Sequence, residues 1–253
     1  MTCPELFQDI PAFIAEILAR RGVASTQELE LKLKHLLAPS LKGLNEAIQL
    51  MDAAIDQQHK IVIVGDYDAD GATSTALMIL ALREMGAQVE YLVPDRFKYG
   101  YGLTPAIADL AFTSFTPDLL ITVDNGISSH DGVKQAQDHG MQVIITDHHL
   151  TTKPTPSAQA VVNPNQLGCD FPSKALAGVG VAFYVLANLS TYRKKLHKSS
   201  AVMSQYLDLV ALGTYADVAS LDYNNRILVD VGLKRIQQHL CRPGISALLE
   251  IAG

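Results

Sequence analysis

The stretch KIVIVGDYDADG, residues 60–71, indicates the fold class of this 253-residue chain. Its first part is a run of β-branched apolar residues, Ile61–Val64, and such runs are typical of strands that are buried on both faces. A glycine and three aspartates follow at once, as in a loop that leaves the end of a strand. Four more β-rich runs occur further along the chain, at Val89–Val93, Leu119–Val123, Val143–Ile145 and Ala160–Val162.

Helical stretches separate the first four of these runs, at Thr73–Met85, Pro105–Phe112 and Asp131–His139. Strands that alternate with helices in this way form a parallel sheet covered by helices on both faces. We therefore predict an α/β fold with a five-stranded parallel sheet between residues 60 and 163. Helical segments are expected before and after the sheet.

The flanking segments show helical spacing of apolar residues. Before the sheet it appears in Leu6–Leu18 and Leu44–Ile55, and Ser25 with Glu28 matches a capping box at the start of a further helix. After the sheet, helices are expected within residues 175–189, 207–212, 227–237 and 245–251.

Composition is that of a folded protein, with 48% hydrophobic and 18% charged residues. The longest apolar stretch, Ala175–Leu189, contains two glycines and is shorter than the roughly 18–20 residues of a membrane span, so we expect a buried helix and no membrane partner. The N-terminus lacks the pattern of a secretory signal. Cys3, Cys169 and Cys241 lack CxxC spacing, which argues against a disulfide framework or zinc site and favours the cytoplasm.

Chemically active residues follow three of the predicted strands. Asp66, Asp68 and Asp70 follow the first, Asp124-Asn125-Gly126 the third, and Asp147-His148-His149 the fourth. The carboxyl ends of parallel strands meet at one edge, where ligands bind. Clustered carboxylates repel one another unless a cation neutralises them, and oxygen ligands with an imidazole suit Mn²⁺ or Mg²⁺. If residues 66–70 form an extended loop, Asp68 and Asp70 can each address a different ion, with Asp124 between the two ions.

Other interpretations of these motifs are weaker. Asp66, Asp68 and Asp70 alone could form a turn or a helix cap before Thr73. A calcium loop that starts at Asp66 requires Glu at its twelfth position, which is Leu77 here. The glycines fit neither nucleotide-binding glycine pattern. The net charge of −6 argues mildly against nucleic-acid binding, although carboxylates that hold metal ions account for part of it.

In this order, GDYDADG (65–71), VDNG (123–126) and TDHH (146–149) resemble the first three motifs of the DHH phosphoesterase family. Additional segments resemble its RecJ-like branch: PDRFKYGYGL (94–103), NPNQ (163–166), LAGVGVAF (176–183) and ALGTYADVASL (211–221). The resemblance implies five metal ligands: Asp68, Asp70, Asp124, His148 and Asp217. It also implies that His149 faces the scissile phosphate. Asp66 is expected to compensate for a histidine that some members carry at the position of Val64.

Three residues are candidates for substrate contacts: Arg96, Lys98 and Asn125. Tyr99 and Tyr101 could stack on bases. The run at residues 193–198, RKKLHK, could follow a nucleic-acid backbone, but such charge runs are more often solvated faces, and we expect a solvated face here.

The resemblance implies a two-metal phosphodiesterase with Mn²⁺ or Mg²⁺ that acts as a 5′-to-3′ exonuclease on single-stranded DNA in repair and recombination. Candidate partners are single-strand-binding protein and other repair proteins. Alternatives are a hydrolase of short oligonucleotides, cyclic dinucleotides or pyrophosphate, and a truncated non-catalytic partner of a replication complex. We expect a helical lead-in, residues 1–58, and a catalytic domain, residues 59–253. The substrate-binding and oligonucleotide-binding-fold domains that the resemblance implies are absent from these residues, so the chain could be a fragment of a longer enzyme.

Overall fold

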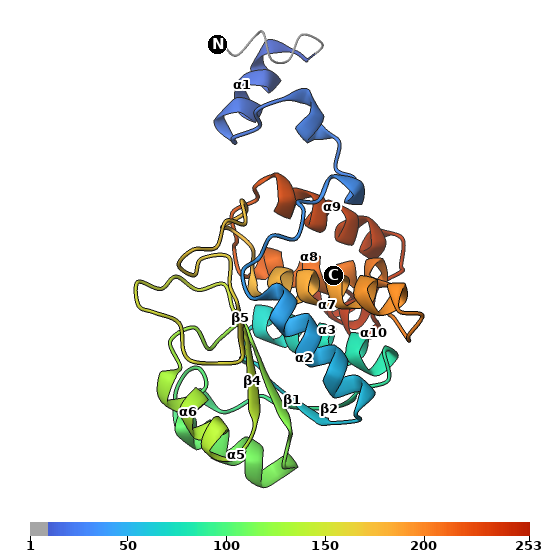
Figure 1. Ribbon diagram of the computed structural model, residues 1–253. Helices are drawn as coiled ribbons and strands as arrows, with labels where there is room; N and C mark the ends of the chain where they lie inside the picture. The colour runs from blue at the N-terminus through green and yellow to red at the C-terminus, as the bar shows by residue number, and fades with distance from the viewer. Residues whose placement is uncertain (1–9) are drawn as a thin grey trace.

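A parallel sheet of five strands lies at the centre of the molecule, in the order β2-β1-β3-β4-β5 (Figure 1). The computed structural model describes residues 10–253. All the strand pairings in this sheet are parallel. The strands are β1 (Lys60–Val64), β2 (Gln88–Leu92), β3 (Leu119–Val123), β4 (Gln142–Thr146) and β5 (Ala160–Val162). The predicted fold class is confirmed, and each predicted strand coincides with an observed one to within one residue at either end.

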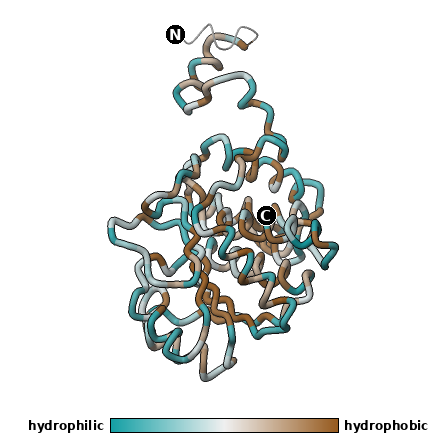
Figure 2. Tube along the Cα trace, in the orientation of Figure 1, coloured by the Kyte–Doolittle hydropathy of each residue, from teal (hydrophilic) through white to brown (hydrophobic). Residues whose placement is uncertain are grey.

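Alternate residues of each strand contribute to two hydrophobic layers, as a period of two requires. Ile61 and Ile63 face a core formed with α2 (Leu44–Asp56), α3 (Ala69–Glu84) and α7 (Gly178–Lys195). On the opposite face, Val62 and Val64 pack in a second core under two helices, α5 (Pro105–Phe115) and α6 (His130–Asp138). Figure 2 shows the apolar strands enclosed between these layers. The predicted helices on both faces are therefore present.

The chain reverses its direction across the sheet next to β1. It passes from β1 through α3 to β2 at one edge, then returns to place β3 on the other side of β1. The loops after β1 and β3 consequently leave adjacent strands toward opposite faces. Such a reversal opens a crevice at the carboxyl ends of the two strands, where ligands bind in open α/β sheets.

The other elements lie before, between and after these. They are α1 (Ala12–Arg20), η2 (Thr26–Leu29), η3 (Leu33–His35), α4 (Arg96–Tyr99), η4 (Met203–Tyr206), α8 (Leu207–Ala216), α9 (Tyr223–Gln237) and α10 (Pro243–Ala252). Helix α1 stands away from the body of the molecule, whereas α2 packs on α7 and β5 (Figure 1). The predicted helical residue Leu6 lies outside the described residues. The division of the chain at residue 58 stays a prediction.

The predicted capping box at Ser25 does not form. Ser25 precedes η2, a short 3₁₀ helix, and its side chain makes no capping hydrogen bond. One oxygen of Glu28 accepts a hydrogen bond from the amide of Ala24 at 3.3 Å, and the other pairs with Arg226 at 2.8 Å. The ion pair with α9 holds the Glu28 carboxylate, so a tertiary contact overrides the local signal.

The sequence suggested that the basic run at residues 193–198 is a solvated face, but two of its residues are held in ion pairs. Arg193 is buried, and its Nη1 donates to Asp52 at 2.5 Å and to Asp56 at 3.1 Å. Lys198 also binds both carboxylates, at 2.7 and 2.6 Å. Because α7 packs against α2, Arg193 and Lys198 supply the counter-charges for two aspartates of α2, whereas residues 194–197 are exposed as expected.

The expectation of a buried helix at Ala175–Leu189 is confirmed by α7, whose residues are mostly buried. Within residues 10–253, no helix has both the length and the apolar character that a membrane crossing requires.

Arg193 gives the first testable prediction. The change Arg193→Met should lower the free energy of unfolding by about 3 kcal/mol, because removing one partner of a buried ion pair leaves carboxylates short of counter-charge. Chemical denaturation measures this loss. Lys194→Met, on the exposed side of the same helix, should change stability by less than about 0.5 kcal/mol. Equal stability of the two variants would contradict a stabilising role for the buried network.

Candidate metal centre

Asp66, Asp68 and Asp70 lie where β1 ends and α3 begins. The sequence suggested one extended loop for these residues, but the helix begins among them. Asp68 is the N-cap of α3, and its Oδ1 accepts a hydrogen bond from the amide of Gly71 at 2.9 Å. The helix therefore starts at Ala69, ahead of the predicted Thr73, and Asp70 lies in its first turn. The cap and the turn separate the two side chains in direction, because successive residues of a helix point to different sides.

Asp70 joins two helices. Its Oδ2 accepts from the amide of Gly178 at 2.6 Å and its Oδ1 from that of Val179 at 2.8 Å. These are the first residues of α7, whose own N-cap residue, Ala177, has no side chain able to cap it. A carboxylate near a helix N-terminus is stabilised by the exposed amides. Asp70 thus fixes the start of α7 against the start of α3, with its side chain almost entirely buried.

Asp124 follows β3 directly and has a positive φ of 60°. Aspartate tolerates this left-handed conformation better than most residues. Its side chain is buried against α7, where a Cβ at Gly178 would lie 2.7 Å from the Cβ of Asp124. The absence of a side chain at Gly178 therefore allows α7 to approach the candidate bridging carboxylate closely.

His148 lies between three of the predicted ligands. Its Nε2 is 3.1 Å from Asp124 Oδ1 and 3.8 Å from Asp70 Oδ2, and its Nδ1 is 4.0 Å from Asp217 Oδ2. Asp217 terminates α8 as its C-cap residue. All five predicted metal ligands therefore converge, together with Asp66 and His149. Three overlapping groups have ligand atoms within 4.8 Å of one another: Asp70, His148 and Asp217; Asp124, His148 and His149; Asp66, Asp68 and Asp124.

Burial makes negative charge unfavourable in this cluster. It raises the pKa of Asp124 to about 7, with Asp70 nearby acting in the same direction. Burial also raises the pKa values of Asp70 and Asp217. Asp124 Oδ1 and His148 Nε2 face each other but are buried without a hydrogen bond of good geometry. A bound cation would satisfy both atoms and stabilise the ionised carboxylates, so these residues fit a divalent ion with oxygen and nitrogen ligands.

The two histidines differ in their surroundings. Burial alone would lower the pKa of His148, but the carboxylates of Asp124, Asp70 and Asp217 raise it to about 9. The hydrogen bond between His149 Nδ1 and Asp147 Oδ1, 2.7 Å long, raises the pKa of His149. His149 is half-exposed at the rim, and its Nε2 lies 3.2 Å from the hydroxyl of Tyr101.

Asp147 positions the histidines, a role that the sequence analysis did not assign. Its carboxylate accepts from the amides of Ile127, His148 and His149 at 2.8, 2.7 and 3.0 Å. Asn163 and Asn165, in the NPNQ segment, donate to the carbonyls of His149 and His148 at 3.0 and 2.6 Å. The sequence signals for Asp147 were its place after β4 and its membership of the TDHH motif, neither of which indicates that it holds the histidines.

The three residues predicted to contact substrate differ in their distance from the carboxylate cluster and in their burial. Arg96 lies at the centre, where it binds Asp66 through Nε and Nη2. Its guanidinium carbon is also 4.5 and 4.7 Å from the ring centroids of Tyr67 and Tyr101. Lys98 Nζ lies 4.9 Å from the ring centroid of Tyr99.

Asn125 is buried, and its amide donates to the carbonyls of Val64 and Val123, joining the ends of β1 and β3. The substrate roles of Arg96, Lys98 and Asn125 stay predictions.

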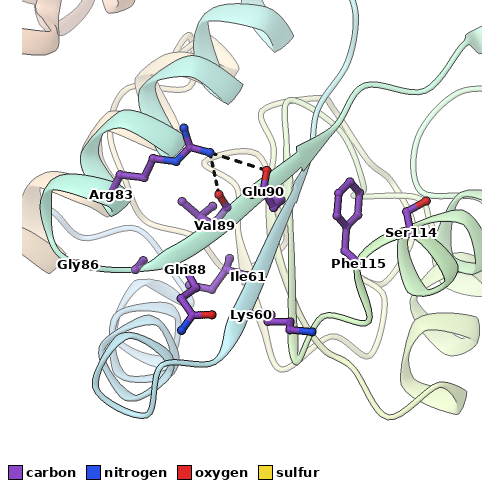
Figure 3. A pocket seen from close by; sticks show the side chains of 10 residues that line it. Lys60, Ile61, Arg83, Gly86, Gln88, Val89, Glu90, Ser114 and Phe115 are labelled. Carbon is purple, nitrogen blue, oxygen red and sulfur yellow. Dashed lines mark hydrogen bonds and ion pairs between the residues drawn. The ribbon is translucent and has the colours of Figure 1, made fainter.

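A pocket of about 680 Å³ lies at the opposite end of the sheet (Figure 3). It is lined by the first residue of β1, Lys60, and by β2 and the ends of α3 and α5. Arg83 there donates to the carbonyl of Val89 at 3.1 Å and lies 3.8 Å from Glu90. This pocket is separate from the carboxylate cluster, which follows the last residues of β1 and β3.

Residues 60–214 match the family described as "DHH family, N-terminal domain". The chain belongs to the DHH family. This match covers the sheet and all the candidate metal ligands except Asp217. The DHH motifs GDYDADG, VDNG and TDHH are thus located at the carboxyl ends of β1, β3 and β4, and the resemblance seen in the sequence is confirmed.

Relatives in this family include the single-stranded-DNA-specific exonuclease RecJ of Dickeya dadantii, which is 51% identical over 257 residues. That match covers 98% of this chain and 44% of the relative, so the chain spans less than half of the relative's length. Among solved structures, RecJ from Thermus thermophilus in complex with Mn²⁺ has a TM-score of 0.76 at 35% identity and covers 92% of this chain and 32% of that one. The complex with Mg²⁺ has a TM-score of 0.63 at 32% identity and covers 92% and 29%.

Replacing Gly178 by Ala should disturb the centre without removing any polar group. The added Cβ would meet the side chain of Asp124 at 2.7–2.9 Å, so the carboxylate must move. We expect Mn²⁺ to raise the melting temperature of the natural chain by preferential binding to the folded state, and to raise that of Gly178→Ala much less. Gly244→Ala, in open space in α10, is the matched control and should keep the full Mn²⁺ effect. An unchanged Mn²⁺ effect in Gly178→Ala would remove Asp124 from the ion site.

The raised pKa of Asp124 predicts a pH effect on the metal-free chain. Folding raises this pKa from 3.8 to about 7, so the stability that the group contributes is present below about pH 4 and is lost as the pH rises to 7. Asp124→Asn cannot lose that proton. In the presence of a chelator, the variant should therefore gain about 1–2 kcal/mol in unfolding free energy relative to the natural chain between pH 5 and pH 8. Melting temperatures across this range measure the difference, and parallel curves would contradict it.

Proposed function

We propose that this chain is the catalytic part of a metal-dependent phosphodiesterase that removes nucleotides from single-stranded DNA in the 5′-to-3′ direction. The observation that carries the proposal is the convergence of Asp68, Asp70, Asp124, His148 and Asp217 at one rim of the sheet. Similarity to RecJ, over nearly the whole of this chain, supports the substrate class. We assign residues 1–58 to a helical lead-in and residues 59–253 to the catalytic domain.

The donor groups suggest how two ions, Mn²⁺ or Mg²⁺, would be held. Asp70, His148 and Asp217 form one set, and Asp66, Asp68 and Asp124 form the other. The contact between Asp124 and His148 makes Asp124 the residue best placed between the two sets. When bound, a pair of divalent ions supplies an activated water and neutralises charge on the phosphate.

The residues around the ions position the substrate in this proposal. His149 is held through Nδ1 by Asp147, and its Nε2 contacts the Tyr101 hydroxyl, a contact that a phosphate oxygen would replace. Arg96 is held in place by Asp66 and two tyrosine rings, which prepares its guanidinium for phosphate. Asn125 is expected to act from its buried place between the strand ends, and Lys98 from the loop after β2.

Partners and location follow from the same function. We propose single-stranded DNA as the substrate, single-strand-binding protein and other repair proteins as partners, and the cytoplasm as the compartment. Much of the grip on DNA is assigned to parts of the longer relatives that this chain does not span.

One observation favours the second candidate, hydrolysis of short oligonucleotides, cyclic dinucleotides or pyrophosphate. Arg193 and Lys198, which could have followed a long nucleic-acid backbone, are paired with Asp52 and Asp56 of α2. These two cations are therefore unavailable to a long strand, which favours a short substrate. The complete set of candidate ligands argues against a non-catalytic scaffold.

An assay on 5′-labelled single-stranded DNA, with and without Mn²⁺, tests the proposal. The chain should show cleavage that depends on Mn²⁺ and that is weak and readily suppressed by salt. Asp124→Ala should reduce the rate more than about 100-fold, because a ligand shared between ions affects both. Asp138→Ala makes the same change on the exposed surface of α6 and should leave the rate unaltered.

Equal cleavage by Asp124→Ala and the natural chain would mean that the activity belongs to a contaminant. Processive digestion by this chain alone would contradict the assignment of grip to absent parts. A strong preference for di- and trinucleotides over long strands would favour the second candidate.

A further inference from the structure

Val218, the residue after Asp217, has an unusual backbone conformation. Its φ is +55°, in the left-handed region that β-branched residues seldom adopt. The other non-glycine residues with positive φ in the part of the chain that the structure describes carry polar side chains: Gln58, Thr116, Asp124, His197 and His239. Among them, Thr116 is also β-branched, but its hydroxyl is hydrogen-bonded to Lys60 Nζ at 3.2 Å.

The local hydrogen bonds show what this conformation does. The amide of Val218 donates to the carbonyl of Tyr215 at 3.2 Å and that of Ala219 to Thr214 at 3.3 Å, which closes the end of α8. This is the helix-ending motif in which glycine is preferred at the left-handed position. The motif places Asp217 at the last turn of α8. Glycine would adopt this left-handed conformation with less strain than valine does. The presence of the isopropyl group therefore requires another explanation.

Packing does not provide that explanation. Val218 is 87% exposed and so contributes almost no apolar burial to the fold. His239 occupies the corresponding position after α9 with a φ of +57°, and its polar ring is an ordinary choice for an exposed helix end. At Val218 the chain instead combines backbone strain with an exposed apolar group.

Val218 lines a cavity of about 540 Å³ that opens on the candidate metal centre. His148, His149 and Asp217 belong to the same wall. Leu150, which is 84% exposed, is a second apolar residue of this cavity. The rest of the lining is formed by the polar residues Asn165, Lys174, Ser220 and Asp222 and by the apolar residues Ala175, Leu176 and Ala219. A chemical group bound in this cavity would lie next to a ligand bound at the metal centre.

We propose that Val218 and Leu150 form the contact surface for the base of the nucleotide whose phosphate is bound at the metal centre. This inference rests on the proposed phosphodiesterase function and adds a subsite to it. A nucleobase has apolar faces and polar edges, which match apolar residues bordered by hydrogen-bonding groups. A base is also the part of a nucleotide that lies beside its phosphate, as this cavity lies beside the centre.

The decisive variant is Val218→Gly, which removes the apolar group and relieves the strain together. Its melting temperature should rise by about 2–4 °C. For a single-stranded oligothymidylate in Mn²⁺, its KM should rise about fivefold at unchanged kcat, because an apolar contact is lost on one side of the base. An abasic oligonucleotide of equal length should show no change. Val218→Ile, which keeps the strain and the apolar group, should retain the natural KM.

His239→Gly is the matched control, with the same backbone change after α9 at a residue that does not line the cavity. It should also raise the melting temperature but leave KM unaltered. A Val218→Gly variant that is stabilised and still has the natural KM for oligothymidylate would overturn the proposal and leave Val218 as a surface for another part of a longer protein. An equal rise in KM for the abasic strand would also overturn it.

A chain without any hydrolytic activity would refute the proposed function but not this subsite. Equilibrium binding of the two oligonucleotides in Mn²⁺ then decides: tighter binding of the strand with bases, lost in Val218→Gly, supports the base contact. Absence of that preference in the natural chain rejects it.

Discussion

The carboxylate of Asp70 is the contact on which the arrangement of the molecule depends. It belongs to α3 yet caps the first turn of α7, more than a hundred residues later in the chain. The cap brings α7 close enough for Gly178 to touch Asp124, and so determines how Asp70 and Asp124 lie relative to each other. A single side chain thereby links helix docking to the geometry of the candidate metal ligands.

Conformations that are unfavourable in isolation gather around this contact. Asp124 has a left-handed backbone, its carboxylate is buried beside Asp70, and its Oδ1 lacks a good hydrogen bond. Val218 adds strain one residue beyond Asp217. Each feature lowers the stability of the folded chain without an ion. Their concentration at one rim, within a well-packed sheet and helix framework, is what binding of a charged ligand would compensate.

The fold could be predicted from the sequence because its strands are short, apolar and separated by helices of clear periodicity. The carboxylates after β1 and β3 could also be predicted as a cluster, since the parallel sheet requires their strands to end at one edge. Asp217 could not be predicted in that way, because a single aspartate at the end of a helix has no local signature. Only the family resemblance pointed to it. The cap formed by Asp68 was among the alternatives that the local sequence offered, whereas the histidine-holding role of Asp147 and the burial of Arg193 depend on contacts between distant segments.

Arg83, beside the pocket of Figure 3, affects how readily this chain associates with other protein molecules. Strand β2 borders the sheet, and one side of its backbone has no strand partner among the described residues. Unprotected borders of this kind can recruit strands from other molecules and begin aggregation. Arg83 occupies the carbonyl of Val89 and lies close to Glu90, placing two charges along that border. A foreign strand would have to displace both, which protects the chain against edge-to-edge association at high concentration.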